Sequence, residues 1–166
     1  TAPTITNVSA STADGTYSTG SIIDVTVTFS ENVTVATANP MLTLELGTTD
    51  RLAEYNSGSL SSILTFKYTV VASDNNTDLD YVASTALNIN GATIRDLALN
   101  NATLTLSAPG AANSLGNNKA IVIDTNAATI TNVSSNKTNA TYTTGEVIDV
   151  TVTFSENVTV ASGTPQ

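Results

Sequence analysis

The chain has 166 residues, a hydrophobic fraction of 40% and a formal net charge of −9, with 14 acidic against five basic side chains. The hydrophobic fraction is enough for a folded core, whereas the negative charge makes nucleic acids and anionic membranes poor partners and divalent cations good ones. The chain has no Cys and no His, which excludes disulfides, the usual zinc sites and the side chain most used for proton transfer near neutral pH.

Alternating apolar residues predict strands along the first 125 residues. The two clearest are 22–30 and 63–72, whose predicted inward residues are Ile23, Val25, Val27, Phe29, Leu64, Phe66, Tyr68 and Val70. Shorter strands are predicted at Thr4–Val8, Val33–Val35, Met41–Leu46, Leu52–Tyr55, Leu79–Val82, Ala92–Ile94, Thr103–Leu106 and Ala120–Ile123. No segment has the apolar stripe and capping residues of a helix. The pattern predicts an all-β Greek-key sandwich.

The sequence restarts after residue 125. The 33-residue segment that begins at Thr4 recurs at Thr129 without a gap and is identical at 24 positions; six of the nine differences fall at residues 10–15, a predicted turn. A repeat of 125 residues has the length of an independent β-sandwich domain. We therefore expect residues 1–125 to form one complete repeat and residues 126–166 to be the first third of a second, near-identical one, within a longer protein whose targeting signals lie elsewhere.

Several segments of the sequence resemble a known repeat. They are VTVTFSENVTV, LTFKYTVVASDNNTDLDY, LNINGATIRDLALNNATLTL and GNNKAIVIDT, followed by the restart at TITNV. Together they resemble the SWM-type tandem repeat, named for a cyanobacterial swimming-motility surface protein, and more broadly the bacterial immunoglobulin-like domains of large adhesins. The resemblance covers residues 1–125 and begins again at 126–166. It implies an immunoglobulin-like sandwich in an extracellular array at a bacterial cell surface, often with calcium near domain junctions, and it implies no enzymatic activity.

A first group of acidic residues lies in the segment SDNNTDLDY. If Leu79 points inward, Asp78 and Asp80 project from the same outer face, and Asp74 precedes them by one short turn. Two carboxylates at this spacing can reach one Ca²⁺ ion, which takes six to eight oxygen ligands. The segment lacks the central Gly and terminal Glu of an EF-hand loop, so a solvated loop is the alternative.

A second group is predicted to assemble across the fold. Glu31 follows the long strand, Asp96 lies in the turn IRDLALNN, and Asp124 ends the repeat just before the restart. If loops from one end of a sandwich gather beside the next domain, these three carboxylates are candidate calcium ligands at the junction. Ordinary turn-forming Asp and strand-end Glu are the alternative.

No pairing of a nucleophile with a base indicates an enzyme. The favoured hypothesis is a stiff spacer in an adhesin-like array, whose partners are neighbouring repeats or copies of the same protein. The alternative is a module that itself binds a host or polysaccharide surface. The opening strands of the second repeat carry an apolar face that includes Val152 and Phe154. We expect residues outside this chain to cover that face, in a longer array or in a strand-exchanged polymer.

Overall fold

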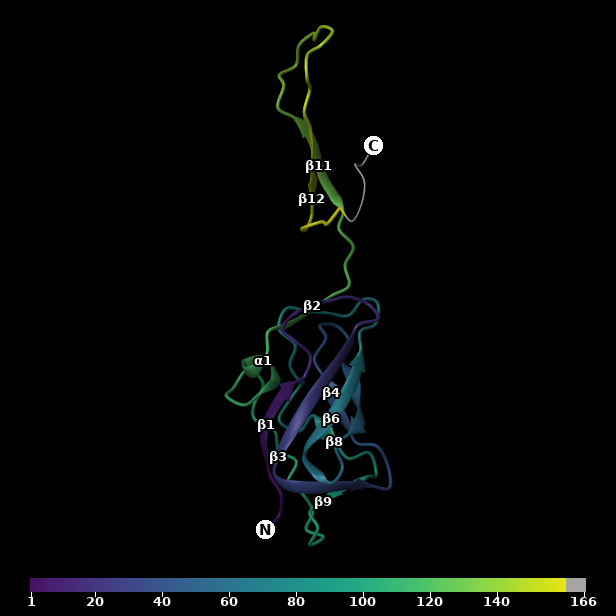
Figure 1. Cartoon of the computed structure of the whole chain (residues 1–166), viewed down its shortest axis with the longest axis vertical. Helices are drawn as coiled ribbons and strands as arrows, with labels where there is room; N and C mark the ends of the chain where they lie inside the picture. The colour runs from purple at the N-terminus through teal and green to yellow at the C-terminus, as the bar shows by residue number, and fades with distance from the viewer. Residues whose placement is uncertain (161–166) are drawn as a thin grey trace. The chain divides into compact units, whose positions relative to one another are not determined.

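A computed structural model of the chain describes residues 1–160 (Figure 1). The chain divides into two compact units, Thr1–Thr125 and a second unit that begins at Asn126. This boundary coincides with the restart of the sequence. Within the described residues, no helix is long and apolar enough to span a bilayer.

Strands dominate the secondary structure of both units. Those of the first unit are β1 (Ile5–Ala10), β2 (Gly15–Tyr17), β3 (Ile22–Ala36), β4 (Met41–Leu44), β5 (Arg51–Ser57), β6 (Ser61–Thr69), β7 (Asn75–Asn76), β8 (Leu87–Asn88), β9 (Thr93–Arg95) and β10 (Ile121–Asp124). Those of the second unit are β11 (Ile130–Ser135) and β12 (Val150–Phe154). A single helical turn, α1 (Leu115–Asn118), is capped by Ser114, whose hydroxyl accepts a hydrogen bond from the Asn117 amide at 3.2 Å.

The large sheet of the first unit has the strand order β1-β3-β6-β5-β4-β8, and β9 pairs with the last residues of β3. Its strands alternate between an inward apolar face and an outward polar face. The eight residues predicted to point inward are all buried, and none is more than 3% exposed. This part of the prediction is confirmed. Because each buried side chain of this size contributes about 1.5–3 kcal/mol, the alternation in β3 and β6 is a main determinant of the fold.

A small sheet, β2-β10-β7, closes the first unit, with β10 parallel to β2 and antiparallel to β7. Ile121 and Ile123 of β10 belong to the same apolar core as the inward residues of the large sheet, and so does Leu115 of α1. The residues of this core lie between Val8 and Ile123, so the first unit supplies its own core. The architecture is all-β with curled antiparallel sheets, consistent with a β-sandwich.

Two predicted strands are absent from the first unit. The segments 79–82 and 103–106 form only isolated bridges, Leu44 with Tyr81 and Thr4 with Thr103. Tertiary hydrogen bonds replace a ladder there: the Leu79 amide donates to the carbonyl of Ile121 at 2.8 Å. Conversely, β2, β7 and β8 were not predicted, because they have two or three residues each and cannot display an alternating pattern.

The second unit contains a hairpin whose strand register repeats that of β1 and β3. Its pairs are Ile130–Phe154, Asn132–Thr153, Val133–Val152, Ser134–Thr151 and Ser135–Val150. Each pair lies 125 positions after a pair of β1 with β3, and the irregularity between residues 130 and 132 matches the one between residues 5 and 7. A near-identical sequence therefore forms the same local structure in both units.

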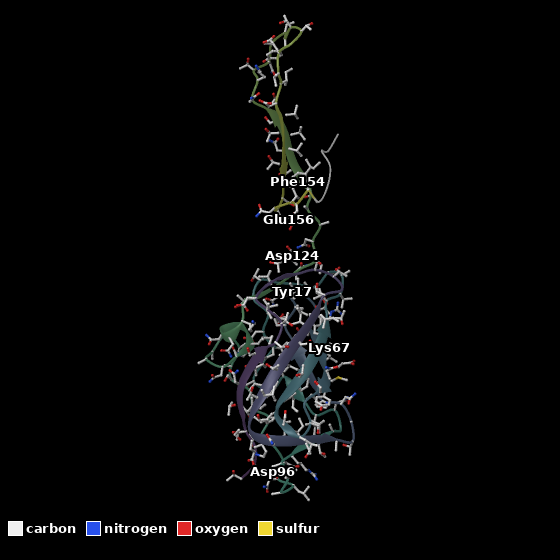
Figure 2. All side chains as sticks on the ribbon, viewed as in Figure 1. Tyr17, Lys67, Asp96, Asp124, Phe154 and Glu156 are labelled. Atoms are coloured by element: carbon white, nitrogen blue, oxygen red, sulfur yellow. The ribbon has the colours of Figure 1, made fainter. Side chains whose placement is uncertain are left out.

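The two hairpins differ in burial. Val27 and Phe29 are 0% and 3% exposed, whereas their counterparts Val152 and Phe154 are 43% and 37% exposed (Figure 2). In the first unit β3 is flanked by β1 and β6, but β12 pairs with β11 alone among the described residues. The second unit thus has the opening strands of a sandwich without the strands that cover them.

Candidate functional site

The chain enters and leaves the first unit at opposite ends. Figure 2 shows Asp96 at one end of this unit and Asp124 at the other. We call the first end the entry pole, because Pro3 and Thr4 contact Thr103 there through a hydrogen bond and a bridge. We call the second end the exit pole, formed by residues 71–75 and Thr125.

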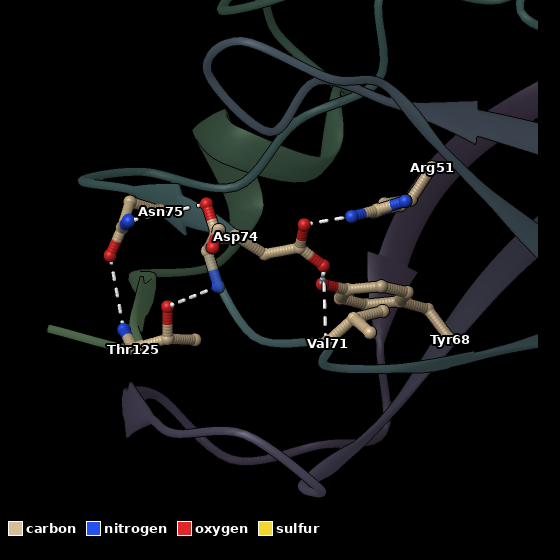
Figure 3. A network of polar contacts seen from close by, with 7 residues as sticks. Arg51, Tyr68, Val71, Asp74, Asn75 and Thr125 are labelled. Carbon is tan, nitrogen blue, oxygen red and sulfur yellow. Dashed lines mark hydrogen bonds and ion pairs between the residues drawn. The ribbon is translucent and has the colours of Figure 1, made fainter.

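Asp74 is the central residue of the exit pole (Figure 3). It is 1% exposed, and its carboxylate accepts three hydrogen bonds. The Arg51 Nε donates to Oδ1 at 2.8 Å, and Oδ2 accepts from the Tyr68 hydroxyl at 2.6 Å and from the Val71 amide at 3.1 Å. The side chain therefore ties β5 and β6 to the loop that follows β6, and it has donors on both oxygens.

The hydrogen bonds to Asp74 outweigh the cost of burying its charge. Burial alone favours the protonated form, but the bonds from Tyr68, Arg51 and Val71 hold the pKa of the Asp74 carboxyl below its ordinary value. The same burial, together with the bond to Asp74, raises the pKa of the Tyr68 hydroxyl above its ordinary value. At neutral pH the pair is a carboxylate that accepts from a neutral phenol.

A second set of bonds fixes the residue from which the chain leaves the first unit. The Ser73 amide donates to the Thr125 hydroxyl at 3.0 Å, and the Thr125 amide donates to Oδ1 of Asn75 at 3.0 Å (Figure 3). Asn75 also pairs with Asp124 in the ladder between β7 and β10. Because Ser73, Asp74 and Asn75 are consecutive, the exit of the chain is anchored to the same loop that Asp74 anchors to the sheet.

Of the first predicted acidic group, the structure brings Asp78 and Asp80 together. A Cβ atom built on Gly116 would lie 3.0 Å from Oδ2 of Asp80 and 3.4 Å from Oδ2 of Asp78, so both carboxylates face the same turn of α1. Leu79 between them is buried, as predicted. Asp80 accepts hydrogen bonds from the amides of Tyr81 and Gly110, both at 2.9 Å. Asp78 is exposed and lines an open polar depression with Gly116.

The second predicted group, Glu31, Asp96 and Asp124, does not assemble within the first unit, so its grouping at one end was wrong. Glu31 follows Ser30, whose amide donates to Thr4 at 2.8 Å, and this places it at the entry pole with Asp96. Asp124 lies at the exit pole (Figure 2). The reason is the course of the chain: β1 begins at the entry pole, where Thr4 bonds to Ser30, and β10 ends at the exit pole, where Thr125 bonds to Ser73 and Asn75.

Asp96 has a clear structural role. It is 4% exposed, and it accepts hydrogen bonds from the backbone amide and the side-chain amide of Asn100, at 2.8 and 2.7 Å. The side-chain bond from Asn100 is the main reason that the pKa of Asp96 lies below its ordinary value. In residues 1–160, no three acidic side chains gather closely enough to hold a metal ion by themselves. Calcium binding therefore stays a prediction.

The residues that organise the exit pole were only partly predicted. Asp74 was singled out by its charge, but its partners were not. Arg51 lies 23 residues before it in another strand, and Tyr68, six residues before it, was predicted only to be buried. Tyr68 was predicted correctly to be buried, and a buried phenol needs a partner. That requirement is the one sequence signal that pointed to this cluster.

Comparison of the chain with models of protein families, with curated proteins and with solved structures gives no match. The resemblance to SWM-type and bacterial immunoglobulin-like repeats therefore stays a prediction based on the motifs quoted above.

Proposed function

We propose that the chain is a structural spacer module of an extracellular bacterial surface protein, in which units like residues 1–125 follow one another along the chain. The observation that carries this proposal is the repeated hairpin. The pairs of β11 with β12 reproduce those of β1 with β3 at an offset of 125, including the irregularity near the start of the first strand. A chain that restarts the same fold directly after completing it is the pattern of a tandem array.

The two poles of the first unit support a spacer role. In a tandem chain, a unit whose entry and exit lie at opposite ends adds its length to the array, whereas adjacent termini would fold the array back on itself. Thr125 is fastened to Ser73 and Asn75 before the chain continues. Only residues 126–129 then separate this anchor from β11, which limits the freedom of the next unit.

The strand order of the large sheet supports the Greek-key part of the finer fold class. Strands β4, β5 and β6 are consecutive antiparallel neighbours, and β3, which precedes them, lies beside β6 rather than β4. The resulting order β3-β6-β5-β4 is that of a Greek key. The β11–β12 hairpin also supports the array: a counterpart of β6 would pair with the free edge of β12, and counterparts of Leu115, Ile121 and Ile123 would cover its apolar face.

A direct test fuses two, three and four copies of residues 1–125 at the natural junction and measures small-angle X-ray scattering. The maximum dimension is expected to increase by a constant step of roughly 35 Å per copy, the diameter of a compact domain of this size. A maximum dimension that stops growing after the second copy would refute the spacer proposal.

The second candidate function is direct adhesion to a polysaccharide. The observation that favours it is a groove beside β5 and β6, lined by polar side chains and by the half-buried ring of Tyr55. Its polar lining includes Arg51, Glu54 and Lys67, and sugars are bound by such combinations of stacking rings and hydrogen-bonding groups. A glycan array probed with the whole chain discriminates between the two functions. Saturable binding that is lost in Tyr55→Ala would favour adhesion over a passive spacer.

A further inference from the structure

The entry pole carries two exposed leucines on one tight turn. Leu97 and Leu99 are 77% and 72% exposed, and they lie in the turn between β9 and Asn101. Leu99 has a φ of 67°, a left-handed conformation that a branched residue adopts only where the surrounding structure enforces it. A polar turn with Gly or Asn at this position would avoid both the strain and the exposed apolar surface.

This turn is held rigidly. Arg95 and Asn101 form a bridge at its base, and the Arg95 Nε donates to the side-chain oxygen of Asn101 at 2.7 Å. Inside the turn, the buried Asp96 accepts from the amides of Asn100, and the Leu99 amide donates to the Asp96 carbonyl at 3.1 Å. The leucines are therefore presented by a preorganised turn that loses little entropy when it binds.

The turn lies beside the point where the chain enters the first unit. The Ala102 amide donates to Ile94 at 2.9 Å, and the next amide, that of Thr103, donates to Pro3 at 2.8 Å. Whatever precedes Thr1 in a tandem chain is thus attached next to Leu97 and Leu99.

We propose that Leu97 and Leu99 dock against the exit pole of the preceding repeat and so fix the angle between successive units. This inference rests on the proposed tandem array and adds to it the surfaces that meet at each junction. The occupant is a second copy of the repeat, because a preceding unit ending at the counterpart of Thr125 would be joined directly to Thr1.

The exit pole offers one exposed apolar side chain. Val71 is 47% exposed and lies on the outward face of the alternation that β6 begins, next to the buried Val70. Its amide is held by Asp74, and two residues further on the Ser73 amide is held by Thr125. The exposed valine is thus fixed beside the last residue of the unit, which is where the leucine turn of a following repeat arrives.

The test uses a chain in which one extra copy of residues 1–125 precedes the 166-residue chain. The natural sequence has no cysteine, so a Thr49→Cys substitution in each complete repeat gives two unique sites for spin labels on exposed loops. Double electron–electron resonance between the two labels then measures the distribution of distances between the repeats. The junction variant carries Leu97→Ser and Leu99→Ser in the second complete repeat. The matched control carries the same two substitutions in the leading repeat, where the turn faces no preceding unit.

The parent is expected to give one narrow distribution, and the control the same one. The junction variant is expected to broaden it by on the order of 10 Å, the span of a flexible linker of about four residues. Val71→Ser in the leading repeat should broaden it as well. Equal distributions in the junction variant and the control would overturn the docking proposal, as would a broad distribution in the parent. Neither result would refute the spacer proposal, because that proposal is tested separately, by the constant increase in maximum dimension per added copy in small-angle X-ray scattering.

Discussion

Replacement of Asp74 by alanine should destabilise the first unit strongly. The variant loses three hydrogen bonds to a charged acceptor, and bonds of this kind contribute about 1.5–3 kcal/mol each. The Arg51 side chain is 32% exposed. Water can therefore replace most of the hydrogen bond that Arg51 loses, and its part of the loss in unfolding free energy is small. The Tyr68 hydroxyl is buried and is left without its acceptor. The free energy of unfolding is therefore expected to fall by about 3 kcal/mol, which corresponds to roughly 10 °C in melting temperature for a domain of this size.

The assay is thermal and urea unfolding followed by circular dichroism, with Asp50→Ala as the matched control. Asp50 is exposed, and its removal changes the net charge by the same amount. The control is expected to melt within about 2 °C of the parent, as is usual for an exposed substitution. Equal melting temperatures for the two variants would refute the role assigned to the buried carboxylate.

The pH dependence gives an independent measurement of the same group. Since the pKa of Asp74 is lowered in the folded state, its ionised form stabilises that state. The contribution is complete above the carboxyl pKa of the unfolded chain and is lost as pH falls through the lower pKa of the folded state. The difference in stability between the parent and Asp74→Ala should consequently shrink in acid. A difference that stays constant down to pH 2 would contradict this assignment.

Two further predictions concern other parts of the molecule. Burial and the nearby Asp80 charge raise the pKa of Tyr81 to about 12. Its contribution to stability is therefore complete below the tyrosine pKa of the unfolded chain and is lost as pH rises through about 12. Unfolding measured between these two pKa values and above should show that Tyr81→Phe loses less stability than the parent as pH rises. The exposed β11–β12 hairpin should make the full chain self-associate, whereas deletion of residues 126–166 should leave a monomer in analytical ultracentrifugation. Monomeric behaviour of both proteins at high concentration would argue against an adhesive apolar face.

Much of the fold could be predicted from the sequence because β3 and β6 are long. In each, inward apolar residues alternate with polar residues such as Asp, Thr or Lys, and only one face of such a strand can be buried. Where a segment bonds to several partners instead of one, the alternation fails as a guide. Leu79 is buried as its pattern indicates, but its segment forms no ladder with another strand. Its amide makes one hydrogen bond to Ile121 at the start of β10.

The candidate site could be predicted less well, because charge in the sequence does not distinguish a structural carboxylate from a free one. Asp74, Asp80 and Asp96 all serve mainly as acceptors for backbone or side-chain donors of their own unit. Most of their donors lie within six residues, but they face the carboxylate only once the loop has folded, and the Gly110 and Arg51 donors lie 30 and 23 residues away. Asp78, which is exposed and faces Gly116 beside Asp80, is the member of the first group that the structure leaves most accessible.

The separation of Glu31 and Asp96 from Asp124 changes where calcium is expected. One calcium ion cannot therefore be held by all three side chains of a single unit. We expect calcium to stabilise the first unit through Asp124, at the exit pole, and to be indifferent to Glu31, at the entry pole.

The measurement is the change in melting temperature between excess calcium and EDTA, for a chain extended to two complete repeats. A site that binds only the folded state contributes about 2.7 kcal/mol at a calcium concentration a hundredfold above its dissociation constant. Asp124→Ala is expected to reduce the response, and Glu31→Gln, which removes a carboxylate at the opposite pole, to preserve it. An equal loss of response in the two variants would contradict the assignment to Asp124, and an unchanged melt of the parent in EDTA would count against calcium altogether.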